Sequence, residues 1–83
     1  MTNTTINKEV SVTRLGFKKN MTVYPQQVEF DGSTINFIDA GISCIVRSGE
    51  RIAQIFTLTD GRSEFRLRSD NNGGAWTLLS ISA

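Results

Sequence analysis

Histidine is absent from this 83-residue sequence, and cysteine occurs only once, as Cys44. A single cysteine excludes an intramolecular disulfide, and without histidine the common zinc ligand sets cannot be assembled. The same absence removes the usual base for a serine or cysteine nucleophile. A lone thiol fits a reducing compartment better than an oxidising one, so we expect a cytoplasmic protein.

Long apolar runs are absent as well. No segment approaches the roughly 18 apolar residues of a membrane span, and the first residues carry neither the basic end nor the apolar stretch of a signal peptide. We therefore expect no membrane association. The net charge of +1 is far from the strongly basic balance of many nucleic-acid-binding domains.

The remaining composition is that of a small globular domain, with 39% hydrophobic and 20% charged residues. Residues 1–8, polar and rich in threonine, predict a flexible N-terminal arm or a weak first strand. Residues 9–83 predict one domain. A chain this short buries only about 60% of its unfolded surface. With neither disulfide nor metal to help, self-association is the support that remains for so thin a core.

Short runs of alternating apolar and polar residues, separated by glycine and asparagine, predict an all-β fold. We expect a small antiparallel meander of about six or seven short strands, strongly curled or closed into a small barrel. Phase changes within the first and last runs indicate bulges, which help a sheet to curl. The expected strands cover residues 10–17, 21–30, 33–38, 42–46, 51–59, 62–69 and 75–81.

Turn residues predict how the first hairpin pairs. A two-residue Asp31-Gly32 loop places Val28 opposite Ile35, which brings their apolar side chains to one face. Pro25 lies inside the preceding run, and proline cannot donate to a strand ladder. We therefore expect residues 21–24 to form an edge or a separate short strand.

The later hairpins follow from the same reasoning. A two-residue Asp60-Gly61 loop places Phe56 opposite Phe65. A three-residue loop over 47–49 keeps Cys44 on the same apolar side, whereas a two-residue loop would turn its strand over. We therefore predict the longer loop and a buried, unreactive Cys44.

The opposite face of these strands combines isoleucine with arginine. A solvated face normally lacks such isoleucines, although arginine stems can cover apolar surface. Arginine is also enriched where proteins contact other proteins or nucleic acid. We predict an interaction face formed by Ile45, Arg51, Ile55, Arg66 and Arg68.

Nucleic-acid binding by a small β-barrel is the alternative use of this arginine-rich face. Lys18, Lys19 and Tyr24, together with Arg66 and Arg68, are the candidate contacts. Single-strand binders stack bases on exposed aromatic rings, but most phenylalanines here fall on the expected core face.

Catalysis has little support in the sequence. Asp31, Asp39, Asp60 and Asp70 each stand in an expected turn, where aspartate is favoured for backbone reasons. We expect neither an enzyme nor a cofactor, metal or small-molecule substrate. The prediction is a non-catalytic protein-interaction module, either homo-oligomeric or bound to a larger protein partner. The same surface would suit a protein that blocks or decorates a larger assembly.

Overall fold

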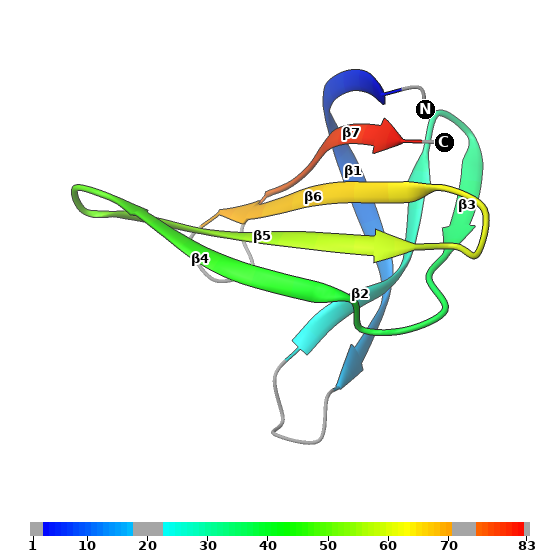
Figure 1. The fold of residues 1–83 in the computed structure, drawn as a ribbon, viewed down its shortest axis with the longest axis horizontal. Coiled ribbons are helices and arrows are strands. Elements are labelled where there is room, and N and C mark those ends of the chain that lie inside the picture. Colours follow the sequence, from blue (N-terminus) through cyan, green and yellow to red (C-terminus); the bar gives the residue numbers. More distant parts are fainter. Residues whose placement is uncertain (1–2, 18–22, 71–74, 83) are drawn as a thin grey trace.

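Seven antiparallel strands form one sheet in the computed structural model, which describes residues 3–17, 23–70 and 75–82 (Figure 1). Their order across the sheet is β3-β2-β1-β7-β6-β5-β4. Sheet neighbours are therefore also neighbours in the chain, except that β1 pairs with β7. The predicted all-β meander is confirmed. The strands are β1 (Asn3–Phe17), β2 (Val23–Phe30), β3 (Ser33–Asn36), β4 (Ile42–Ser48), β5 (Arg51–Thr59), β6 (Glu64–Asp70) and β7 (Trp76–Ser82).

The sheet curls strongly but does not close. The Phe37 and Phe65 rings meet edge to face across the interior, with centroids 5.5 Å apart. The segment between β3 and β4 crosses to β5, where the Ile38 N–H donates to the Thr59 carbonyl at 3.0 Å. In the described residues β3 and β4 are the two ends of the sheet and do not pair. The protein is therefore a curled sheet rather than a closed barrel.

A small apolar core fills the concave side of the sheet. Its side chains alternate along the strands with outward-pointing ones, as the period of two requires. Burying each one stabilises the fold by about 1.5–3 kcal/mol. Trp76 packs at the margin of this core, with its ring centroid 5.5 Å from that of Phe56. The core residues are Val10, Val28, Phe37, Phe56, Leu58, Phe65, Leu67 and Leu78.

The predicted bulges are confirmed. In β1 the pairing with β2 shifts between Val12 and Leu15. In β7 the shift falls at Leu79, because Leu78 pairs with Leu67 while Ser80 pairs with Arg66. These bulges increase the local twist and so help the sheet to curl.

The first hairpin pairs as predicted, with Val28 opposite Ile35. Pro25 is buried in β2 but lies before Gln27, where pairing with β3 begins. Val23 and Tyr24 therefore have β1 as their strand neighbour and form an edge, as the proline predicted, whereas residues 21 and 22 of the predicted edge lie outside the described residues.

The β5–β6 hairpin differs from the prediction in loop length. Thr59 pairs with Glu64, so the loop is residues 60–63 and Phe56 lies opposite Leu67 rather than Phe65. Asp60 lengthens the loop, because its Oδ1 accepts the backbone N–H groups of Arg62 and Ser63, each at 2.9 Å. The change is two residues, so every side chain keeps its predicted face.

In the β4–β5 hairpin, the predicted loop length was wrong and the strand register differs from the prediction by an odd number of residues. Ser48 pairs with Arg51, leaving a two-residue Gly49-Glu50 loop instead of the predicted three-residue loop. Gly49 has φ of 63°, and a type II′ turn needs glycine at its first central position. The resulting shift is odd and turns β4 over. Cys44, predicted to be buried, lies opposite Ile55 and is exposed.

The N-terminal segment is strand rather than arm in the part that the structure describes. From Asn3 to Thr5, and again from Lys8, β1 pairs with β7. Asn7, at φ of 53°, stands in the shift between these two stretches. The weak first strand, the other interpretation of residues 1–8, is therefore the one that holds for residues 3–8.

Candidate interaction face

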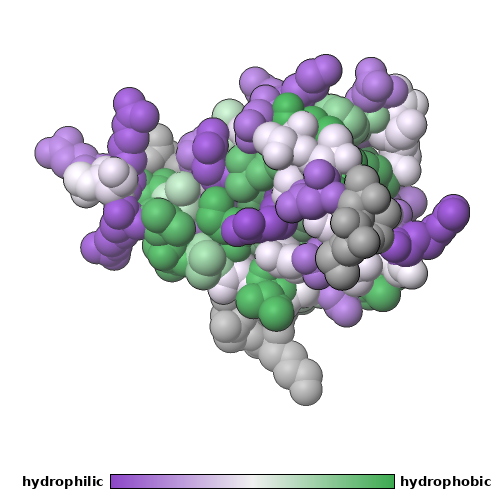
Figure 2. Space-filling view, turned by 45° about the horizontal axis from the view of Figure 1, so that its top comes forward, coloured by the Kyte–Doolittle hydropathy of each residue, from purple (hydrophilic) through white to green (hydrophobic). Residues whose placement is uncertain are grey.

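The convex side of β4, β5 and β6 brings apolar and basic side chains together, and we call this surface the outer face. Strand register arranges its members in cross-strand rows. One row runs from Cys44 through Ile55 to Arg68, and the next contains Thr57 and Arg66. Figure 2 shows apolar surface bordered by hydrophilic side chains around the β4–β5 hairpin, at left. The outer face comprises Ile42, Cys44, Val46, Ser48, Arg51, Ala53, Ile55, Thr57, Thr59, Glu64, Arg66, Arg68 and Asp70.

Four of the five residues predicted for the interaction face share this surface: Arg51, Ile55, Arg66 and Arg68. Ile45 does not, because the two-residue loop turns it to the concave side, opposite Gln54. It is nevertheless 65% exposed, since the β4–β5 hairpin projects beyond the core (Figure 1).

Three apolar side chains of β4 take the place of Ile45 on the outer face. Ile42 is 75% exposed, Val46 is 48% exposed, and Cys44 is also exposed. The predicted three-residue loop placed these side chains on the core face, because they are more apolar than Ser43, Ile45 and Arg47, with which they alternate. The signal that identifies them is glycine at the first position of a two-residue turn.

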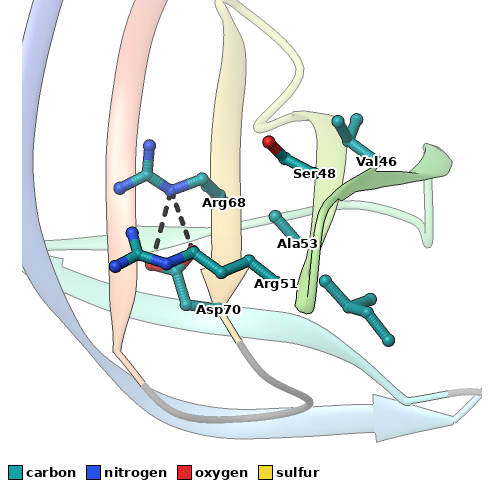
Figure 3. Close-up of a pocket in the computed structure, with 7 residues that line it drawn as sticks. Val46, Ser48, Arg51, Ala53, Arg68 and Asp70 are labelled. Carbon is teal, nitrogen blue, oxygen red and sulfur yellow. Dashed lines mark hydrogen bonds and ion pairs between the residues drawn. The ribbon is translucent and has the colours of Figure 1, made fainter.

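A pocket of about 470 Å³ lies at the end of the outer face nearest the β4–β5 turn. Val46 and Ala53 give it apolar walls, and Figure 3 shows the Arg51 and Arg68 side chains extending in the same direction beside Asp70. Such a pocket offers guanidinium donors next to methyl groups. This combination suits an acidic side chain from a partner protein, because arginine binds carboxylates in a fixed, two-pronged geometry. The lining residues are Val46, Ser48, Arg51, Ile52, Ala53, Arg68 and Asp70.

Asp70 partly neutralises the pocket. The Arg68 Nε–H lies 3.2 Å from Asp70 Oδ1 and 3.4 Å from Oδ2. Both side chains are about 40% exposed, and an ion pair at that exposure contributes at most about 1 kcal/mol. The pair therefore orients Arg68 more than it stabilises the fold.

The candidate nucleic-acid contacts are not gathered in one place. Lys18 and Lys19 lie outside the described residues. The Tyr24 ring is partly buried against the core and lies over Gly16, where an added Cβ would come within 2.5 Å of the Tyr24 Cζ. Its strand, β2, is separated by β1 and β7 from β6, which carries Arg66. Tyr24 therefore does not offer a stacking surface beside the arginines.

Within the described residues, no helix is long and apolar enough to cross a membrane. The same part of the chain holds no cluster of three or more side chains of the metal-binding types. Comparison with protein-family models, with curated proteins and with solved structures gave no match.

Proposed function

We propose that this protein is a non-catalytic interaction module of the cytoplasm that self-associates through the apolar and basic outer face of β4, β5 and β6. The observation that carries the proposal is the row Cys44, Ile55 and Arg68, in which apolar and cationic side chains stand side by side on an exposed surface. Interface cores are enriched in apolar residues and arginine and depleted of other charged residues.

The thin core supports the same proposal. Few hydrophobic side chains are fully buried. The single cysteine excludes an intramolecular disulfide that could stabilise the chain. Small domains without a disulfide or metal commonly gain stability by oligomerisation. Covering the exposed side chains of β4 would add buried apolar area that the single chain lacks.

Ile55→Glu tests the proposal, with native mass measured by light scattering on a size-exclusion column. A glutamate here stands opposite Arg68, so the variant gains a cross-strand ion pair and is expected to fold. Leu15→Glu is the control, since Leu15 is 49% exposed on β1, which β7 and β6 separate from β5.

We expect Ile55→Glu to lower the native mass and Leu15→Glu to leave it unchanged, at both about 50 mM and about 500 mM salt. An apolar interface should survive the higher salt, because screening acts on exposed charges. An unchanged mass in Ile55→Glu would mean that the outer face is not the interface.

Nucleic-acid binding remains the second candidate, favoured by the presence of Arg51, Arg66 and Arg68 on one surface. It predicts an affinity that falls steeply with salt, in proportion to the phosphates neutralised. Replacing Arg66 and Arg68 by glutamine should weaken binding and reduce that slope. An affinity for nucleic acid that does not change with salt concentration, or no binding at about 50 mM salt, would exclude this candidate.

A further inference from the structure

The two edges of the sheet are very different. The β3 edge is only Ser33–Asn36, four residues with a single apolar side chain. The β4 edge is Ile42–Ser48, seven residues that pair with β5 without interruption. Natural edge strands are usually shortened, bulged or charged to prevent pairing with another chain. Between Ile42 and Val46, β4 has no charged residue, proline or bulge.

The backbone of β4 is ready to accept another strand. The two-residue turn makes Ser48 and Arg51 a hydrogen-bonded pair, and such pairs alternate along an antiparallel ladder. The alternation directs the N–H and C=O groups of Ser43, Ile45 and Arg47 to the open edge. Among the described residues, no strand pairs with that side of β4.

We propose that β4 pairs antiparallel with β4 of a second copy of this chain, about a two-fold axis at either Cys44 or Ile45. The proposal rests on the self-association put forward above but places the contact at the β4 edge of the outer face, so that Ile55, on β5, lies one strand away from the partner copy. It joins two seven-stranded sheets into one continuous sheet. We call the line along which the two β4 strands pair the seam. Ile42, Cys44 and Val46 of each copy extend the outer face across it.

Charge along the strand favours a second copy in this orientation. Asp39 precedes β4, whereas Arg47 and Arg51 lie at its far end. Antiparallel pairing brings Asp39 of each copy to the basic end of the other, where the two arginines outweigh Glu50. Parallel pairing would place like charges together, which destabilises a strand pair.

The side chains of the seam are also self-complementary. With the axis at Ile45, that residue meets its own counterpart and Cys44 meets Val46. With the axis at Cys44, Ile42 meets Val46. In both registers Arg47 lies opposite a neutral residue, Ser43 or Gly41. An isologous two-fold interface requires this kind of match between a surface and itself.

Ile45→Lys is the decisive variant. Ile45 is 65% exposed, so the change leaves the core intact while placing two lysines at the seam. Phe17→Lys is the matched control, because Phe17 is 64% exposed at the end of β1. We expect the wild type and Phe17→Lys to have the same native mass, and the mass of Ile45→Lys to be half of it.

Cys44 gives a second test that needs no substitution. Across the proposed seam the two Cys44 residues lie directly opposite or diagonally, about 4.5–8 Å apart between Cα atoms. A bis-maleimide spanning about 8 Å should therefore link the wild type and Phe17→Lys into covalent dimers, and should leave Ile45→Lys unlinked. Since the sequence contains one cysteine, any link joins Cys44 to Cys44.

The outcomes separate the two proposals. An oligomer that keeps its mass in Ile45→Lys and forms no Cys44 link overturns edge pairing. If that oligomer also dissociates in Ile55→Glu, self-association through the outer face stands. A dimeric wild type without the link overturns the proposed axis. A wild type that stays monomeric at every protein concentration overturns both self-association and edge pairing.

Discussion

Replacing Gly41 by alanine should destabilise the protein much more than the same change at Gly32. Both residues have positive φ, 59° and 78°, so each alanine incurs the cost of a left-handed backbone, about 1–2 kcal/mol. At Gly32 no atom lies within 4 Å of the added Cβ. At Gly41 the Cβ would overlap the Thr57 carbonyl and come within 2.9 Å of Leu58 Cδ2.

The overlap at Gly41 is with backbone that cannot easily move, because Thr57 is held between β4 and β6. Overpacking of this kind costs a further 1–3 kcal/mol, roughly. The expected losses of unfolding free energy are therefore about 2–5 kcal/mol for Gly41→Ala and about 1–2 kcal/mol for Gly32→Ala.

Urea unfolding followed by the fluorescence of Trp76, the single tryptophan, measures this difference. With a denaturant slope of about 1 kcal/mol/M, the two midpoints should differ by about 1–3 M at equal protein concentration. Midpoints that coincide would refute the close approach of the β3–β4 segment to β5.

Other positions give independent tests. Leu67 is fully buried, so Leu67→Ala should cost about 2–5 kcal/mol in urea unfolding, and a loss below about 1 kcal/mol would contradict its place in the core. The N–H groups of Ser63 and Arg62 lower the pKa of Asp60 from its usual 3.8. The stability that this carboxylate adds is therefore complete above the usual pKa and is lost as the pH falls through the lowered one. Asp60→Asn should flatten the dependence of the urea midpoint on pH in that acidic range, and an unchanged profile would contradict it. Asp70→Asn should alter stability at neutral pH by less than about 1 kcal/mol, because the Arg68 pair is exposed; a larger loss would show a tighter pair. Iodoacetamide should alkylate Cys44 in the folded protein, more slowly as protein concentration rises and β4 pairs; a thiol that reacts only in urea would contradict its exposure.

Hairpins whose turn residues and apolar alternation agree were predictable from the sequence. Asp31-Gly32 lies between runs that alternate clearly, and its register is confirmed. At Asp60 the side chain captures two backbone N–H groups and extends the loop by two residues. The predicted faces survived because side chains alternate with a period of two.

The candidate site was harder to predict, because it depends on the strand with the weakest alternation. Ile45 adds an apolar side chain to the phase of Ser43 and Arg47, which weakens the alternation of β4, and favouring a continuous core gave the wrong turn. One odd shift then moved Ile45 off the predicted face. The three arginines were placed correctly because Phe56 and Leu58 in β5, and Phe65 and Leu67 in β6, mark the inward phase of each strand.

The pairing of the N-terminal segment had no local signal. Asn3, Thr4 and Thr5 are polar, and their partners in β7 lie almost a whole chain length away. Only the assembled sheet explains why these residues form a strand.

The pairing of β1 with β7 also has a kinetic consequence. β1 obtains its second neighbour in the sheet only from residues 76–82. At about 5–20 residues per second, a ribosome takes about 3 to 12 s to make the chain between β1 and β7. Contacts so distant in sequence also slow folding once synthesis is complete. The β4 segment is made before β7, so its edge exists while the sheet is still incomplete; if copies pair through β4 as proposed, nascent chains on one messenger are the first place where two such edges would meet.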